Sequence, residues 1–217
     1  MIKLKDLLLE GKPPSIFVPR RVENRLERMI ALYVRNGSKG DLNLSNFKLT
    51  KLPEILKNVN VSEDFICSDN KLTSLEFAPS SVGGNFFCNY NKLTSLEGAP
   101  ISVNGDFWCD NNKLTSLKGA PKSVGGCFYG DHNELTSLEG APKTVGINFY
   151  CYRNLLTSLQ GAPSSVGKDF YCQYNLLTSL EGAPSSVGKD FHCFNNPVQF
   201  TERDVRTVCD VKGNVYV

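Results

Sequence analysis

The strongest constraint on this chain is a phrase that recurs every 21 residues. The phrase, F-x-C-x-x-N-x-L-T-S-L-E-G-A-P-x-S-V-G, begins at Phe65, Phe86, Phe107, Phe128, Phe149, Phe170 and Phe191. An earlier copy with aliphatic residues begins at Leu42, a step of 23 residues before Phe65. One such unit cannot bury its own apolar side, so the period predicts a solenoid of stacked coils. We expect about eight repeats over residues 41–198.

Within each unit, the alternation in Phe170-Tyr171-Cys172 predicts a short strand with Phe and Cys inward and Tyr outward. The Gly and Pro of LEGAP exclude a long helix, so the return path should consist of turns and extended segments. Stacked strands would then form a parallel sheet about 40 Å across, over a shared core of Phe, Cys, Leu and Val.

Two further positions recur in every unit. The position after the repeated Val is Gly83, Gly125, Gly146, Gly167 and Gly188, with Asn104 as a substitute, and this predicts a left-handed turn. A second column predicts a ladder of amides that bond the backbone at the bend after the strand. Its members are Asn70, Asn91, Asn112, Asn133, Asn154, Asn175 and Asn196.

The whole pattern resembles a leucine-rich repeat over roughly residues 40–200. The LTSL element and the Pro-containing turn that follows are similar to the short-repeat class found in secreted bacterial effector proteins. The resemblance implies an α/β right-handed solenoid with a parallel β-sheet on a concave face that binds protein partners. Phe and Cys stand where Leu is usual in that class, and Ala-Pro stands where Leu-Pro is common.

Both flanks of the array have sequences typical of caps. Residues 11–40 form the predicted N-terminal helical cap, with a helix over 19–36 that carries Leu26, Ile30 and Tyr33 on one face. Residues 199–217 form the predicted C-terminal cap. It contains a short helix that begins after Thr201, with Asp204 three residues on, and a last strand over 213–217.

Six cysteines share one inward position of successive coils, which predicts core packing rather than a metal site or disulfides. They are Cys67, Cys88, Cys109, Cys151, Cys172 and Cys193. No spacing brings a nucleophile, a base and an orienting group together, so we predict neither an enzyme nor a cofactor. Some effectors of this class carry a C-terminal ubiquitin-ligase domain, for which about 20 residues after the last repeat are too few.

Composition agrees with a folded protein, since 41% of residues are hydrophobic and 21% are charged. No apolar run approaches the roughly 20 residues that span a bilayer, and residues 1–12 lack a secretory signal. We therefore expect a cytoplasmic protein with no membrane partner. The net charge is +2, with nine Lys and Arg against four Asp and Glu in residues 1–40, which we interpret as a solvated helix face.

The outward strand positions carry the candidate binding surface, because a row of aromatic rings is typical of interface hot spots. The predicted partner-binding residues are Phe87, Trp108, Tyr129, Tyr150, Tyr152, Arg153, Tyr171, Tyr174, His192 and Phe194. Two alternatives stay open: a cross-strand ladder that only stabilises the sheet, and a single-stranded nucleic-acid site. Asp69, Asp110 and Asp131 on the same face disfavour nucleic acid. We expect a monomer.

The segment MIKLKDLLLEG resembles the capsid-targeting peptides of T-even-type bacteriophage internal proteins, which end in Leu or Ile, any residue, then Glu. Here Leu8 and Glu10 precede Gly11, and the LTSLEGAP array is similar to hypothetical leucine-rich proteins of large phages. The resemblance implies cleavage of residues 1–10, packaging in the virion head, and binding of a host protein in the host cytoplasm. The alternatives are an ordinary N-terminal tail and a structural or adhesive virion component.

Overall fold

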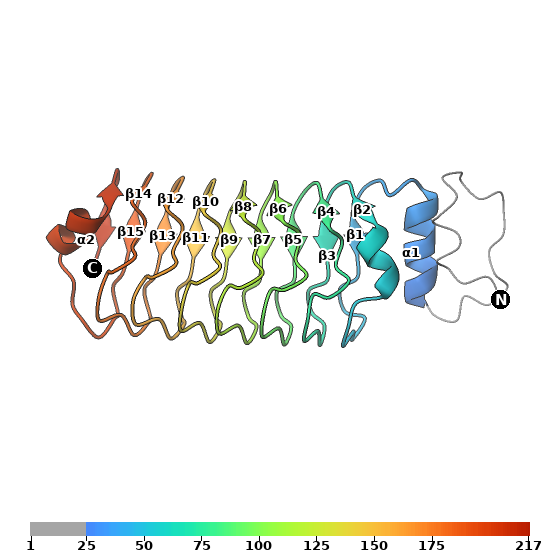
Figure 1. The fold of residues 1–217 in the computed structure, drawn as a ribbon, viewed down its shortest axis with the longest axis horizontal. Helices are drawn as coiled ribbons and strands as arrows, with labels where there is room; N and C mark the ends of the chain where they lie inside the picture. The colour runs from blue at the N-terminus through green and yellow to red at the C-terminus, as the bar shows by residue number, and fades with distance from the viewer. Residues whose placement is uncertain (1–24) are drawn as a thin grey trace.

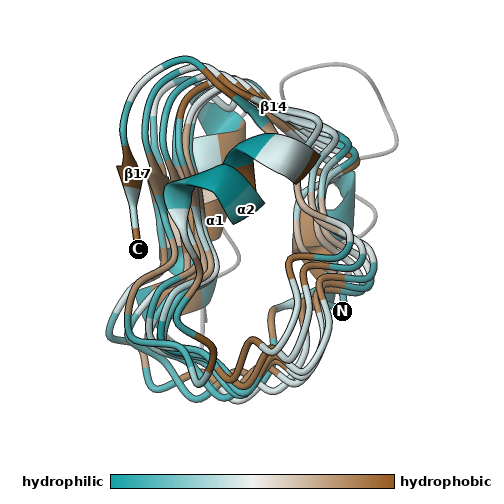
Figure 2. Ribbon diagram, turned by 90° about the vertical axis from the view of Figure 1, so that its left-hand side faces the viewer, coloured by the Kyte–Doolittle hydropathy of each residue, from teal (hydrophilic) through white to brown (hydrophobic). Residues whose placement is uncertain are grey.

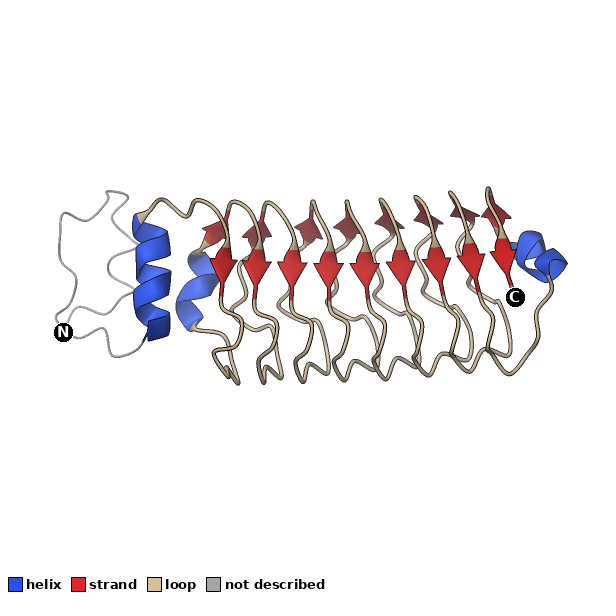
Figure 3. Cartoon of the chain, turned by 180° about the vertical axis from the view of Figure 1, so that it is seen from behind, coloured by secondary structure: helices blue, strands red, loops and turns tan. Residues whose placement is uncertain are grey.

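The computed structural model describes residues 25–217, which form a single stack of coils between two helices. The coils follow one another along a nearly straight line from α1 (Arg25–Arg35) to α2 (Glu202–Val208), as Figures 1 and 3 show. The stack therefore has little of the curvature that produces a concave side. The predicted processing site at residues 8–11, and the part of the predicted helix before Arg25, lie outside the described residues.

A nine-stranded parallel sheet runs the whole length of the stack, and it confirms the strands predicted from the 21-residue period. Each strand has two residues, and each Phe pairs in register with the Phe of the next coil, as in Phe149 with Phe170. Its strands are β1 (Leu42–Asn43), β3 (Phe65–Ile66), β5 (Phe86–Phe87), β7 (Phe107–Trp108), β9 (Phe128–Tyr129), β11 (Phe149–Tyr150), β13 (Phe170–Tyr171), β15 (Phe191–His192) and β17 (Val215–Tyr216).

A second set of parallel strands lies on another side of each coil, where the sequence predicted only turns and extended segments. Figure 2 looks along the stack and separates β17 from β14 on two sides of the ring. The strands are β2 (Asn60–Val61), β4 (Ser81–Val82), β6 (Ser102–Val103), β8 (Ser123–Val124), β10 (Thr144–Val145), β12 (Ser165–Val166), β14 (Ser186–Val187) and β16 (Asp210–Val211). Strands β6 to β16 form a six-stranded sheet, and β2 and β4 pair separately.

The glycines after the repeated Val are not left-handed, which corrects the turn predicted from that column. They are required because the backbone of the neighbouring coil lies too close for a side chain. A Cβ on Gly146 would lie 2.0 Å from the carbonyl oxygen of Gly125, and one on Gly125 would lie 2.1 Å from that of Asn104. Asn104 carries a Cβ, and the strand pairing is interrupted just there, between β4 and β6.

The left-handed residues lie at two other positions of the coil. One is the Gly of LEGAP, with φ between 80° and 94° in Gly98, Gly119, Gly140, Gly161 and Gly182. The other precedes each ladder Asn and has φ between 51° and 55° although its residues are not glycines. This left-handed column consists of Asp69, Tyr90, Asn111, His132, Arg153, Tyr174 and Asn195.

The interior contains the residues that the repeat predicted. The seven Phe rings are fully buried, and neighbouring rings lie 5.1–5.6 Å apart between centroids. Every cysteine of the inward column is reduced and buried, and burial raises the pKa of these thiols, as in Cys109. The asparagine ladder is also confirmed: Asn112 Oδ1 accepts from Leu93 N at 2.9 Å, and its Nδ2 donates to three carbonyls.

Helices cover both ends of the core. At the N-terminal end, α1 buries Ile30 and Tyr33, and the 3-10 helix η2 (Glu54–Asn58) buries Leu56. At the C-terminal end, Thr201 and Asp204 form the predicted cap of α2, with reciprocal side-chain and backbone bonds. The guanidinium of Arg206 donates to Val211 O at 2.6 Å and to Gly213 O at 2.9 Å. No helix within residues 25–217 is long and apolar enough to span a membrane.

Candidate functional site

The outward side of the nine-stranded sheet carries a continuous stack of seven rings, which we call the aromatic row. Adjacent centroids are 3.7–5.7 Å apart, and from Trp108 onward the rings are close to parallel. The row consists of Phe87, Trp108, Tyr129, Tyr150, Tyr171, His192 and Tyr216. Six of these rings were predicted from the sequence, and Tyr216 is added by the last strand.

Stacking determines what the aromatic row presents to solvent. Each inner ring packs its two faces against its neighbours, so the rings are half-buried and expose their edges. The row therefore stabilises the sheet as a cross-strand ladder, whatever else it does. It also leaves no free ring face within Trp108–His192 on which a nucleotide base could stack.

A column of carboxylates and amides, which was not predicted from the sequence, runs beside the aromatic row. Its members precede the inward residue that begins each strand, and Oδ1 usually accepts from the next member's backbone N, as in Asp64 from Asn85 at 2.7 Å. Asn148 Nδ2 donates to the Tyr150 hydroxyl at 2.8 Å, which places the column against the row. The column is Asp41, Asp64, Asn85, Asp106, Cys127, Asn148, Asp169, Asp190 and Asn214. The signal was present in the sequence, since only Cys127 departs from Asp or Asn.

Two more carboxylates lie on the other side of the row, in adjacent coils. Asp110 and Asp131 are 6% and 5% exposed. Asn111 donates to Asp110 at 2.7 Å, and His132 Nδ1 lies 2.8 Å from Asp131 Oδ2. Burial raises the pKa of Asp110 to about 6, and the nearby charge of Asp131 contributes to the rise. Oδ1 of Asp110 has no hydrogen-bond partner among the described residues.

Tyr150, Tyr152 and Tyr171 remain protonated over the physiological range. Burial, reinforced by neighbouring aspartates, raises the pKa of Tyr152 and Tyr171 to about 12. The same causes raise the pKa of Tyr150, although the bond from Asn148 opposes them. Burial is also the main reason that the pKa of His192 is lowered. The rings from Trp108 to His192 are therefore uncharged at neutral pH, and the negative charge of the face comes from its carboxylates.

The remaining predicted residues lie along the edge of the sheet where the strands end. Tyr152, Arg153, Tyr174 and Phe194 come from the last three regular coils. The Arg153 guanidinium lies 5.3 Å from the centroid of the Tyr174 ring, and that ring meets Phe194 edge-on at 5.6 Å. Tyr174 is 44% exposed, and beside it Leu155 and Leu176 are 45% and 46% exposed. The structure thus divides the ten predicted residues into a stacked row and an exposed edge.

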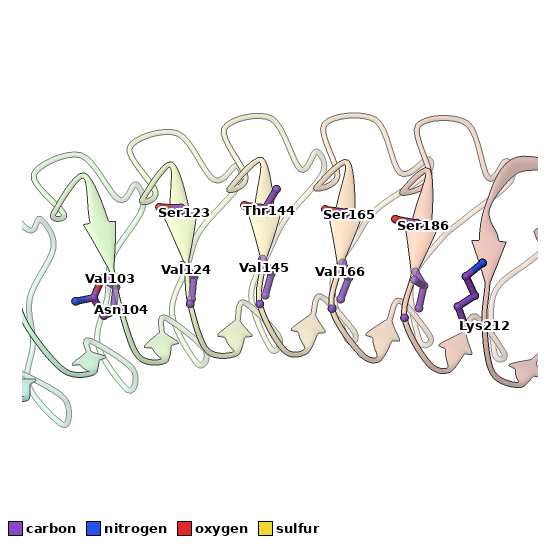
Figure 4. A pocket seen from close by; sticks show the side chains of 15 residues that line it. Val103, Asn104, Ser123, Val124, Thr144, Val145, Ser165, Val166, Ser186 and Lys212 are labelled. Carbon is purple, nitrogen blue, oxygen red and sulfur yellow. The ribbon is translucent and has the colours of Figure 1, made fainter.

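The described residues also form a shallow groove of about 620 Å³, but it lies on the six-stranded sheet, away from these residues. Figure 4 shows its lining of Ser, Thr and Val side chains from successive strands, with Lys212 at one end. Lys212 is its only charged lining residue, and no carboxylate or imidazole lines the groove beside the hydroxyls. Within residues 25–217, no group of three or more His, Cys, Asp or Glu side chains is arranged to hold a metal ion.

The architecture is a parallel β-solenoid of 21-residue coils, and it is like that of a leucine-rich-repeat solenoid. No family model and no curated protein matches the sequence. Among solved structures, the chain is similar to YopM from Yersinia enterocolitica WA-314, with 17% sequence identity and a TM-score of 0.32. The match covers 88% of this chain and 53% of the YopM chain, so this chain spans about half the length of that structure.

Proposed function

We propose that this protein is a non-enzymatic protein-binding module, with its site on the outward side of the nine-stranded sheet. The observation that carries the proposal is an exposed apolar edge in the last coils, formed by Leu155, Tyr174, Leu176 and Val198. Earlier coils have Lys71, Lys92 and Lys113 at the position of Leu155 and Leu176. Lysine is therefore compatible with the fold there, and a contiguous apolar patch is typical of a surface that a partner covers.

Backbone conformation supports the same edge. Arg153 and Tyr174 adopt φ of 52° and 55°. This left-handed conformation is less favourable in free energy for a bulky residue than for Asn. Asn111 and Asn195 hold the same position in other coils at the same φ, so the fold accepts the less strained residue. The large side chains of Arg153 and Tyr174 are thus kept at exposed positions although their backbone conformation is unfavourable. This favours a role for them in binding.

The test compares affinity and stability for the two kinds of edge residue. For a partner isolated by pull-down, Leu176→Lys should weaken binding by at least tenfold, which is about 1.4 kcal/mol. Its melting temperature should stay close to that of the unchanged protein, because Lys occupies this position in earlier coils. Glu181→Ala, on an exposed turn of the same coil, is the control. Unchanged affinity for Leu176→Lys and for Tyr174→Asn would place the binding site elsewhere.

A second, more specific proposal concerns the biological setting of this binding module. It depends on the resemblance of residues 1–11 to a capsid-targeting peptide. We propose a phage protein that is cleaved between Glu10 and Gly11, packaged in the virion head, and delivered to the host cytoplasm to bind a host factor or defence protein. Mass spectrometry of purified virions should then find an N-terminus at Gly11. Virions that contain only the chain beginning at Met1, or none of this protein, would remove the packaging proposal and leave the binding module intact.

A further inference from the structure

The outward side of the nine-stranded sheet is strongly acidic, although the whole chain has a net charge of +2. Four columns of side chains cover this side: the aromatic row, the column that precedes each strand, the column of Asp110 and Asp131, and the left-handed column. Together they carry eight Asp, one Arg, and neither Lys nor Glu. The aspartates are Asp41, Asp64, Asp69, Asp106, Asp110, Asp131, Asp169 and Asp190.

Few of these charges are neutralised within the described part of the chain. Lys189 Nζ lies 3.6 Å from Asp169 and 3.5 Å from Asp190. No Lys or Arg between residues 25 and 217 forms an ion pair with the other six aspartates, and Asp131 has only His132. The uncompensated charges therefore lie in the first two coils and in the middle of the sheet, where Asp106, Asp110 and Asp131 are found, and all are away from Lys189.

The middle of the face combines carboxylates with aromatic edges. Asp106 and Asp110 alternate with Trp108 along one strand, so they lie on either side of its ring, and Asp131 is beside Asp110 in the next coil. Asp110 is nine-tenths buried, and its Oδ1, which is out of contact with solvent, accepts no hydrogen bond from the residues between 25 and 217. Buried carboxylates that lack a cation are costly, and a partner that brings one removes the cost.

We propose that this face binds a basic protein surface, with Arg or Lys side chains of the partner placed against Asp106, Asp110 and Asp131. The inference rests on the proposed protein-binding function and specifies the chemistry of its partner. Nucleic acid is disfavoured because phosphates would meet the same carboxylates. Apolar contacts at the edge formed by Leu155, Tyr174 and Leu176 would lie next to this acidic centre, as in interfaces that combine steering charges with hydrophobic anchors.

The experiment uses the full chain and two defined probes, fluorescein-labelled dodecapeptides of repeated Arg-Tyr-Gly and of repeated Glu-Tyr-Gly, in a fluorescence anisotropy titration. We expect the Arg peptide to bind, with an affinity that falls as salt is raised, and the Glu peptide not to bind. The combined variant Asp106→Asn, Asp110→Asn, Asp131→Asn should weaken binding by at least tenfold. The matched control, Glu76→Gln, Glu97→Gln, Glu181→Gln, makes the same change in net charge at exposed turns and should alter the affinity less than twofold.

Several outcomes would overturn the proposal. Equal binding of the two peptides, equal loss in the two triple variants, or tighter binding of a labelled oligothymidine would each contradict a basic protein partner. Circular dichroism melting of the Asp variant separates lost binding from lost folding, because Asn conserves the side-chain shape. If a protein partner instead depends on Leu176 but is insensitive to the three Asp→Asn changes, the binding module stands and the acidic centre is not its site.

Discussion

The two sheets of this solenoid are built from the same coils, yet their outward sides are unlike. Four of the six strands of the six-stranded sheet present Ser or Thr with Gly two residues later, whereas seven of the nine strands of the other sheet present Phe, Trp, Tyr or His. The glycines of the six-stranded sheet are required because the backbones of neighbouring coils lie very close together. A Cβ added to any glycine of this column would collide with a carbonyl of the neighbouring coil. Side chains can therefore vary from coil to coil only where neighbouring backbones leave space for a side chain, which is the case on the nine-stranded sheet. A specific binding surface is accordingly expected on that sheet.

Among the substitutions that test this difference between the two sheets, Gly146→Ala on the six-stranded sheet should have the largest effect. The new Cβ would lie 2.0 Å from Gly125 O, so the two coils must separate, and we expect a loss of about 3 kcal/mol in the free energy of unfolding. Urea denaturation followed by circular dichroism measures this loss. Thr144→Ala, an exposed change in the same coil, is the control and should cost well under 1 kcal/mol. A tolerated Gly146→Ala would mean that the coils are not as tightly stacked here as the structure shows.

The next largest effect is expected in the aromatic row, for Tyr150→Ala. Its ring stacks between Tyr129 and Tyr171 at 4.7 and 4.6 Å, and it accepts a bond from Asn148. Losing two stacked pairs and part of a buried surface should reduce stability by about 2 kcal/mol. Because Tyr150→Ala should lower stability more than the loss of a fully exposed ring would, reduced binding by this variant could reflect unfolding. Binding experiments are therefore better done with variants of Leu176. A melting temperature unchanged by Tyr150→Ala would show that the rings contribute nothing to the sheet.

A smaller effect with a distinct pH dependence is expected for Asp110, which faces Asp131 and His132. Its pKa is about 6 in the folded protein and about 3.9 in an unfolded chain, so it stabilises the fold below pH 4 and loses that contribution as pH rises to 6. Asp110→Asn should therefore raise the free energy of unfolding by about 1 kcal/mol at pH 7.5 and hardly change it at pH 4. An equal change at both values would contradict the raised pKa.

The smallest expected effect is a gain of about 0.5 kcal/mol for Tyr90→Asn. Tyr90 is 54% exposed and left-handed with φ of 51°, and its side chain makes no ring contact or hydrogen bond with any residue between 25 and 217. Asn tolerates this conformation better, as Asn111 does one coil later. Differential scanning calorimetry should show a slightly higher melting temperature. A lower one would mean that the tyrosine ring stabilises its coil in a way the contacts do not reveal.

Much of the fold was predictable because a repeat defines its own register. The step from Phe65 to Phe86 places successive strands side by side, and the inward Cys and the ladder Asn follow from the same alternation. The glycine column was misinterpreted for a physical reason. A recurring Gly is required either by a left-handed backbone or by a close neighbour, and a sequence does not distinguish the two until the coils are stacked.

The candidate site was only partly predictable. Alternation identified the outward rings, but it did not show that Trp108 and Tyr129 lie 3.7 Å apart with their faces packed together. It also missed the carboxylate column, because residues such as Asp64 and Asp106 come just before the recognisable Phe. Their significance depends on a hydrogen bond between coils, in which Oδ1 accepts from a backbone N–H 21 residues later. The partner-binding role of the ten residues stays a prediction.

The hydrogen bonds of the Arg206 guanidinium affect whether another chain can pair with the edge of the six-stranded sheet. Stacked coils are an open-ended arrangement, and a bare last coil would be a template on which another chain could continue the ladder. Here two carbonyls near the end of the stack already accept from one side chain, held in turn by Glu202 at 2.7 Å. A strand that paired with β16 would first have to displace that arginine, so a single cation protects this edge of the six-stranded sheet against edge-to-edge association.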